Sequence, residues 1–302
     1  MKPSADAARK PGPIAVLIDL TKLRISAAST VTAAAGYIAC LRHADAGLLT
    51  TLGGILLMAM GSSAINECQE RQFDARMART RARPLPRGTI SLRAALAIAG
   101  GLAVAGFLVL LLAHGLVSAL LGALALGWYN AFYTPLKRVS AFAVVPGALI
   151  GALPPAIGWT AAGGRLNDPT ALALSFVFFI WQVPHFWMLV AIHADGYRAA
   201  GFPTIVALLG RQRLARLSFT WICGTAAACA LLPIFRAVVT PPGLLLLAAA
   251  CSWLVYSGVS LLRPDPDAAV FRHAFVRLNG FALVLTLVLI LDPLLARSSG
   301  GG

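Results

Sequence analysis

The sequence predicts an all-α membrane protein built as a bundle of nine transmembrane helices. Its 302 residues are 59% hydrophobic and only 12% charged, whereas an ordinary soluble domain has about 25% charged residues. A chain this apolar cannot cover a surface that faces water, so its solvent must be lipid. Backbone groups in lipid must be hydrogen-bonded internally, and the sequence lacks the alternating ten-residue strands of a membrane barrel. The apolar stretches are therefore expected to be helices.

Nine apolar stretches are long enough to cross a hydrocarbon core, which needs roughly 17–25 residues. They lie near residues 24–41, 47–65, 92–113, 115–134, 141–162, 170–192, 216–235, 243–262 and 274–295. No separate soluble domain interrupts them. We expect residues 1–302 to form a single transmembrane domain, with flexible tails at 1–13 and 297–302.

The basic residues are unevenly distributed between the two sides of this arrangement. All but four of the 25 Lys and Arg precede the first span or fall in every second connection, the exceptions being Arg42, Arg165, Arg236 and Arg297. The positive-inside rule places the basic side in the cytoplasm. Topology and anionic lipid headgroups then explain the net charge of +14, and no nucleic-acid partner is needed.

The end of the second span carries an unusual group of polar residues. Asn66, Glu70 and Asp74 are spaced i, i+4, i+8, and each step of four residues turns a helix by only about 40° past a full circle. All three oxygen-bearing side chains therefore project from one face, as ligands for Mg²⁺ would. Arginines suited to phosphate follow at positions Arg71, Arg76, Arg79, Arg81, Arg83 and Arg87.

This stretch has two interpretations. It is a diphosphate–Mg²⁺ site, or it is a charged cytoplasmic loop that only stops translocation. Carboxylates at i, i+4 destabilise a helix unless a cation binds them, which favours the metal site. We expect Asp74 to lie at the water-filled mouth of the protein.

Two further clusters lie on the same side. Tyr133, Lys137 and Arg138 end the fourth span, where such residues are also common interfacial anchors. Asp195 follows the sixth span, and His185 lies inside that span directly after Pro184. An ionisable group at membrane depth is a candidate functional residue, although His185 is equally consistent with a packed, hydrogen-bonded histidine.

The pattern N-x-x-x-E-x-x-x-D, followed by x-x-M-x-R-T-x-x-R-P-L, resembles the first acidic motif of the UbiA superfamily of intramembrane prenyltransferases. The strings FDARMARTRARPL, YTPLKR, GALPPAIGW and VPHFWML are most similar to the branch that farnesylates heme. The resemblance implies nine helices around a central cavity, with two polar motifs at its cytoplasmic mouth that bind a diphosphate through Mg²⁺. It further implies transfer of farnesyl from farnesyl diphosphate to a vinyl group of heme B, giving heme O.

The resemblance also implies a role for each polar cluster. The expected catalytic residues, all of which except the tyrosine would hold Mg²⁺, are Asn66, Glu70, Asp74, Tyr133 and Asp195. The expected diphosphate-binding residues are Arg71, Arg83, Lys137 and Arg138. His185 would contact heme, as an iron ligand or by hydrogen bonding. The implied setting is a bacterial inner membrane with the active site facing the cytoplasm, in contact with downstream heme A synthesis or oxidase assembly proteins.

The chain departs from the family pattern at three places. Ala82 and Ala143 stand where the family usually has Asn, and Gly196 precedes Tyr197 where an Asp is usual, with the acid one place earlier at Asp195. Three alternative functions therefore stay open. They are prenylation of an aromatic quinone precursor, a heme-binding assembly factor without catalysis, and a cation-coupled transporter.

Overall fold

The computed structural model describes residues 12–299, and helices are the only regular structure in that range. The elements in chain order are α1 (Pro13–Leu20), α2 (Leu23–Leu41), α3 (Ala46–Asp74), α4 (Leu92–His114), α5 (Leu116–Gly127), η1 (Trp128–Tyr133), α6 (Thr134–Leu136), α7 (Val144–Gly147), α8 (Leu149–Ala161), α9 (Pro169–Ile192), α10 (Ala194–Ala199), α11 (Ile205–Ala228), α12 (Leu231–Ile234), α13 (Pro241–Gly258), η2 (Val259–Leu262) and α14 (Ala268–Ser299). The all-α prediction is confirmed for these residues.

Eight helical segments within residues 12–299 are long and apolar enough to cross a membrane. They coincide with the second to ninth predicted spans, and the segments at Ala46–Asp74, Ile205–Ile234 and Ala268–Arg297 extend well beyond them. The predicted first span is the helix α2, which is 19 residues long but rich in Ala, Ser and Thr. It is not among the eight, so the count of nine is not confirmed.

The helix α2 is an inner helix of the bundle. Its second half, from Ala33 to Ala39, is buried. Gly36 of α2 and Gly158 of α8 let the two backbones meet, since a Cβ at either would overlap a carbonyl oxygen of the other helix. Small residues allow such close packing in lipid, where apolar side chains gain nothing from avoiding water. This close contact fixes α2 against α8 inside the bundle.

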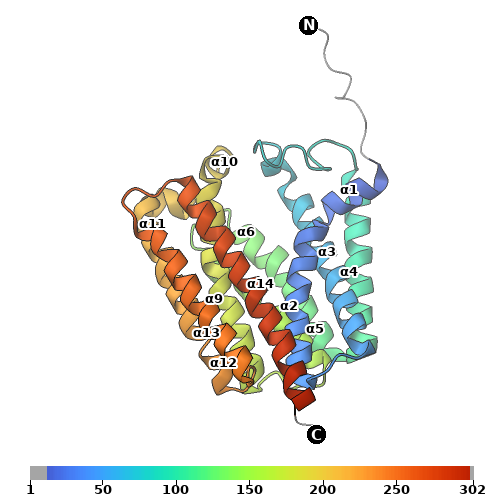
Figure 1. Cartoon of the computed structure of the whole chain (residues 1–302). Coiled ribbons are helices and arrows are strands. Elements are labelled where there is room, and N and C mark those ends of the chain that lie inside the picture. The colour runs from blue at the N-terminus through green and yellow to red at the C-terminus, as the bar shows by residue number, and fades with distance from the viewer. Residues whose placement is uncertain (1–11, 300–302) are drawn as a thin grey trace.

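The long helices run side by side in two groups (Figure 1). In one group α3 packs against α4, and α2 packs against α8; in the other α9 packs against α11 and α14. α1, α10 and the connection between α3 and α4 lie at the same end, whereas α14 ends at the opposite one. The connection between α3 and α4 and the one between α9 and α11 therefore lie at the same end of the bundle.

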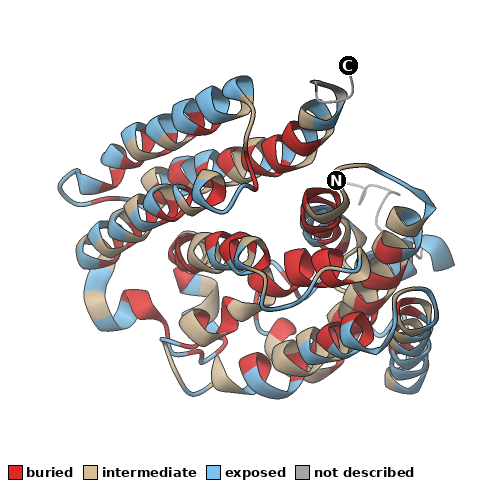
Figure 2. Cartoon of the chain, turned by 90° about the horizontal axis from the view of Figure 1, so that it is seen from below, coloured by how far each residue is buried: buried red, intermediate tan, exposed pale blue. Residues whose placement is uncertain are grey.

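Buried residues lie on the helix faces turned toward the interior of the bundle, and exposed residues lie on the outward faces (Figure 2). Large apolar residues are prominent among the exposed ones, for example Leu49, Leu112 and Leu245. Such a surface is expected where lipid is the solvent. Of the predicted flexible tails, Pro13 begins α1 and residues 297–299 belong to α14; the rest lies outside the described residues.

Candidate active site

The site is built on the last turns of α3, at the end of the bundle that carries α1 and α10. Helix α3 continues to Asp74, so Asn66, Glu70 and Asp74 do share one helix face, as their spacing predicts. We call these three residues the acidic face. They are 2%, 6% and 1% exposed. Asp74 is therefore buried, contrary to the expectation that it lies at a water-filled mouth.

Each residue of the acidic face contacts a cation from a different segment of the chain. The contacts are Lys22 Nζ to Asn66 Oδ1 at 2.9 Å, Lys137 Nζ to Glu70 Oε1 at 2.8 Å, and Arg83 Nη1 to Asp74 Oδ2 at 2.7 Å. Buried carboxylates are costly unless paired in this way. The pairing explains how a helix tolerates two buried acids one turn apart.

The pair between Glu70 and Lys137 is incomplete as a hydrogen bond. The two atoms are at ion-pair distance, yet Oε1 of Glu70 has no partner with hydrogen-bond geometry among the described residues. Charge attraction acts over this distance whatever the N–H···O angle, whereas a hydrogen bond also needs a favourable angle. Oε1 of Glu70 is thus a buried oxygen with capacity for another ligand.

Lys22 is a site residue that the sequence analysis missed. It lies at the break between α1 and α2, where its φ of 48° turns the chain. Burial, together with repulsion from Arg83 and Lys137, lowers the pKa of Lys22 to about 8. The sequence feature that could have revealed Lys22 is its position between two apolar segments. In the sequence analysis it was counted only among the basic residues that set the membrane orientation.

Tyr133 and Lys137 reach the site through a turn of π-helix, η1 (Trp128–Tyr133). Such turns are frequent at functional sites. The ring of Tyr133 stacks on Tyr129 and on Phe186 of α9, with centroids 5.7 and 5.8 Å away. The ammonium of Lys137 lies 5.4 Å from the Tyr133 ring centroid. Tyr133 and Lys137 therefore connect the acidic face to a group of stacked rings. We call these rings, Tyr129, Tyr133 and Phe186, the aromatic wall.

Two of the predicted cations contact other groups. Arg138 donates to the carbonyl of Gln69 and lies over the ring of Phe73, 5.0 Å from its centroid. Arg71 donates to the carbonyl of Cys68 on its own helix and is exposed. Of the four predicted diphosphate-binding cations, the structure brings Arg83 and Lys137 to the acidic face. It does not bring Arg71 or Arg138 there.

Asp195 is also separate from the acidic face. Its side chain is 87% exposed and forms an ion pair of 3.6 Å with Arg198, three residues along α10. Within residues 12–299 no group of three His, Cys, Asp or Glu side chains is arranged to hold a metal ion. The one-residue shift of the acid rotates its side chain by about 100°, and the structure has it facing solvent.

Tyr197 takes the inward position that Asp195 lacks. Tyr197 lines a small cavity together with Tyr133 and Lys137, and burial raises the pKa of its phenol. Its ring packs edge-on against Phe202 at 5.8 Å. Tyr197 had appeared in the sequence only as the partner of a displaced acid.

His185 lies in α9 among aromatic rings. The centroids of Trp181, Phe275 and Phe186 are 4.8, 4.9 and 5.5 Å from its own. Its Nδ1 is buried and has no hydrogen-bond partner among the described residues. Because Phe186 also stacks on Tyr133, His185 is separated from Tyr133 by one aromatic ring.

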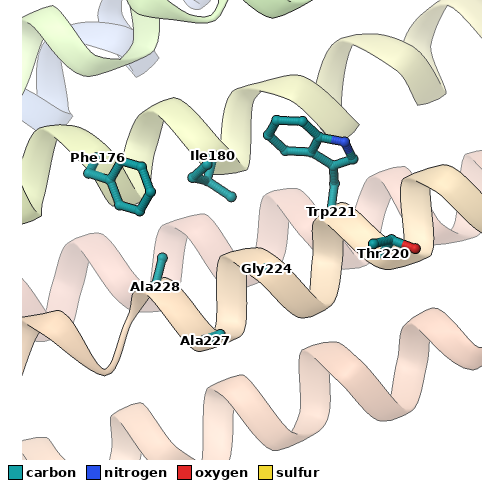
Figure 3. A pocket seen from close by; sticks show the side chains of 7 residues that line it. All are labelled: Phe176, Ile180, Thr220, Trp221, Gly224, Ala227 and Ala228. Carbon is teal, nitrogen blue, oxygen red and sulfur yellow. The ribbon is translucent and has the colours of Figure 1, made fainter.

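A separate apolar pocket lies between α9 and α11 (Figure 3). Phe176 and Ile180 of α9 face Thr220, Trp221 and Gly224 of α11 across it. None of the residues that line it is charged, and none belongs to the acidic face. This pocket is therefore not the candidate active site.

Fold and site together define an integral, multi-pass membrane enzyme with a polar site buried at one end of a helical bundle. The chain belongs to the UbiA prenyltransferase family, whose family model matches residues 28–287. The expectation drawn from the sequence motifs is thereby confirmed at the level of the family. The protein is accordingly a prenyltransferase.

Curated relatives cover most of the chain. A protoheme IX farnesyltransferase of Geobacter sulfurreducens is 41% identical over 272 residues, which are 88% of this chain and 97% of the relative. One from Oleidesulfovibrio alaskensis is 33% identical over 276 residues, 91% of this chain and 95% of the relative. The chain thus resembles this group of bacterial enzymes over nearly its whole length.

Solved structures share the fold at low sequence identity. A digeranylgeranylglyceryl phosphate synthase has a TM-score of 0.74 at 15% identity, covering 93% of this chain and 98% of that one. A UbiA homologue from Archaeoglobus fulgidus bound to DMAPP and Mg²⁺ has a TM-score of 0.66 at 14% identity, covering 91% and 98%. These likenesses confirm the UbiA-type bundle.

Proposed function

We propose that this enzyme transfers the farnesyl group of farnesyl diphosphate to a vinyl group of heme B, giving heme O. The observation that carries the proposal is the acidic face, where buried oxygen ligands and three cations meet beside an aromatic wall. Relatives named protoheme IX farnesyltransferase support heme as the acceptor. We also propose that residues 1–302 act as a single domain.

The acidic face fits Mg²⁺ by its donor set. Glu70 and Asp74 supply carboxylates and Asn66 an amide oxygen from one helix face, and Oε1 of Glu70 has ligand capacity left. Mg²⁺ typically takes one or two carboxylates and fills its shell with water and phosphate oxygens. When bound, Mg²⁺ would neutralise negative charge that develops on the diphosphate.

The three cations supply the complementary half of the donor site. Lys22, Lys137 and Arg83 are held against the acidic face, within reach of an anion that binds there. As the C–O bond of the allylic diphosphate breaks, negative charge grows on the leaving group. Ammonium and guanidinium groups already in position stabilise this charge without reorganising.

The aromatic wall suits the other product of that bond cleavage, an allylic cation. The stacked rings of Tyr129, Tyr133 and Phe186 present π faces, which attract a cation within about 6 Å. The surrounding bundle excludes bulk water, which would otherwise capture the cation before the acceptor does. The vinyl group then forms the new C–C bond, and the carbon left electron-deficient takes hydroxide from water with release of a proton.

We place heme beside His185 in this proposal. Its unpartnered Nδ1 and the surrounding rings of Trp181 and Phe275 suit a flat aromatic macrocycle next to the reaction centre. We further propose a bacterial inner-membrane location with the acidic face on the cytoplasmic side, because the basic connections lie at that end. Contact with heme A synthesis or oxidase assembly proteins belongs to the same proposal.

The test is to incubate the purified protein with heme B, farnesyl diphosphate and Mg²⁺ and to analyse the heme by mass spectrometry. We expect a product heavier than heme by one farnesyl group and one hydroxyl group. Chelation with EDTA should abolish it. Prenylation of an aromatic quinone precursor instead of heme would refute the proposed acceptor but leave the donor site intact.

A further inference from the structure

A small cavity is lined by Tyr133 and Lys137 together with residues of α9, α10 and the start of α11. Its volume is about 40 Å³, and a single water needs roughly 10–15 Å³ of such space. It therefore has room for a few waters or one small polar group, but not for a ring system. Its polar lining residues are Tyr133, Lys137, Ser140, Trp187, Tyr197 and Thr204. We call it the donor-lined cavity.

Every one of these polar residues can donate a hydrogen bond, and no acidic residue lines the cavity in the described part of the chain. Trp187 is 2% exposed, and its indole N–H has no hydrogen-bond partner within residues 12–299. An indole nitrogen can only donate. A buried donor without a partner is costly to folding, which indicates that a ligand or ordered water accepts from it.

The hydroxyl groups reinforce this excess of donors. The Oγ1 of Thr204 already accepts from the backbone N–H of Ala207, and the Oγ of Ser140 accepts from that of Phe142. Each keeps its hydroxyl hydrogen for another acceptor. Lys137, whose ammonium also pairs with Glu70, adds a cation to the lining. This combination of donors and positive charge suits an anion with two oxygens.

We propose that the donor-lined cavity binds a carboxylate of the acceptor, which for protoheme IX is a propionate. The proposal rests on the proposed function and names the group by which the acceptor is oriented. Tyr133 lines both this cavity and the aromatic wall. A carboxylate held by Trp187 therefore anchors the acceptor next to the site where the allylic cation forms.

The diphosphate of the donor is the other anion that this lining chemistry would accept. Helix α3, which carries the acidic face, contributes no residue to the cavity among those described. A diphosphate with its Mg²⁺ also needs far more space than a few waters. These observations favour the carboxylate.

The experiment compares protoheme IX with its dimethyl ester, which keeps the ring but carries no carboxylate. Binding to the purified, detergent-solubilised protein is followed by Soret absorbance. We expect the wild type to bind protoheme on the order of tenfold more tightly than the ester, as for a hydrogen bond to a charged group. Trp187→Phe, which keeps the ring but removes the N–H, should abolish that preference.

Trp221→Phe is the matched control, because Trp221 packs edge-on against Trp187 at 5.8 Å but lines the other pocket. It should keep the preference. In turnover assays Trp187→Phe should raise the KM for heme, with kcat and the KM for farnesyl diphosphate nearly unchanged. If it instead weakens farnesyl diphosphate binding, the cavity serves the donor and the proposal is wrong.

Two outcomes separate this proposal from the proposed function. Equal binding of protoheme and the ester by the wild type, with farnesylated heme still formed, overturns the carboxylate subsite alone. A preference for the free acid that Trp187→Phe removes, with no farnesylated heme formed, overturns the reaction but leaves the subsite standing. The first comparison needs no variant, so a variant that fails to fold does not prevent a decision.

Discussion

The guanidinium of Arg83 lies 2.7 Å from the carboxylate of Asp74, and this contact ties the connection after α3 back onto the acidic face. Asp74 is 1% exposed in this pair and Arg83 24%. Asp74→Asn keeps the size of the side chain but removes its charge. We expect Mg²⁺-dependent turnover to fall on the order of 10²–10³-fold, as when one electrostatic contact to a developing charge is lost.

Because Asp74 is buried, the same variant should also lose some stability. The expected loss is roughly 1.5–3 kcal/mol, the contribution of a hydrogen bond to a charged group. Thermal unfolding in detergent measures it, and turnover is then compared well below the lower midpoint. Near-normal turnover of folded Asp74→Asn would show that the acidic face is not the metal site.

Asp195→Asn is the matched substitution at an exposed acid. Since its side chain is 87% exposed and contacts Arg198, we expect turnover within about twofold of the wild type, as is usual for exposed ion pairs of small energetic value. The two variants are assayed side by side across Mg²⁺ concentrations. A raised Mg²⁺ requirement in Asp195→Asn would mean that α10 turns its acid inward when substrate binds.

Lys22 should make donor binding depend on pH. Its pKa is lowered to about 8, so its ammonium is lost as pH rises through that value. We expect kcat/KM for farnesyl diphosphate, which reports the free enzyme, to fall above about pH 8. Lys22→Arg stays charged and should shift that fall to higher pH; a profile identical to that of the wild type would exclude Lys22 as its origin.

The same pKa has a consequence for stability of definite sign. The folded-state pKa of Lys22, about 8, is below the ordinary value of 10.5, so between these pH values the unfolded chain binds more protons. The free energy of unfolding therefore rises with pH across this window. Lys22→Met should show a smaller rise, measured as the change in thermal midpoint between pH 8 and pH 10.

His185→Leu tests the proposed contact with heme. Its Nδ1 has no hydrogen-bond partner among the described residues, whereas Asn279 interacts with the imidazole, so the thermal midpoint of the variant is measured beside wild type and binding is compared well below the lower midpoint. We expect heme affinity to fall on the order of tenfold, while farnesyl diphosphate binding, measured by calorimetry, stays unchanged. Unaltered heme spectra and turnover would return His185 to a packing role.

Gly158→Ala tests the contact between α2 and α8. The added methyl group would overlap the carbonyl oxygen of Ala33, and forcing atoms into a well-packed interior costs roughly 1–3 kcal/mol. Gly100→Ala in α4 is the control, since a Cβ there meets no described atom within 4 Å. We expect a lower thermal midpoint for Gly158→Ala and an equal or higher one for Gly100→Ala, because Ala favours helix over Gly. Equal midpoints would show that α2 and α8 separate easily.

Most of the helices could be predicted from hydropathy, because lipid forces every backbone group into internal hydrogen bonds. Helix α2 was predicted in this way too, but its place in the bundle was not. It lies buried against α8 through Gly36 and Gly158, and a local sequence window does not contain the helix that it packs on.

Local periodicity alone determined that Asn66, Glu70 and Asp74 share a face, since helical geometry is set by the residues within one segment. The partners of that face were decided by tertiary structure. Lys22 comes from a break between two helices, and Trp187 was left with an unpartnered N–H by the packing of α9 on α11. The sequence specified which charges and donors the chain carries. Only the folding of distant segments onto one another decided which of them meet, because pairing across a bundle depends on three-dimensional distance and not on spacing along the chain.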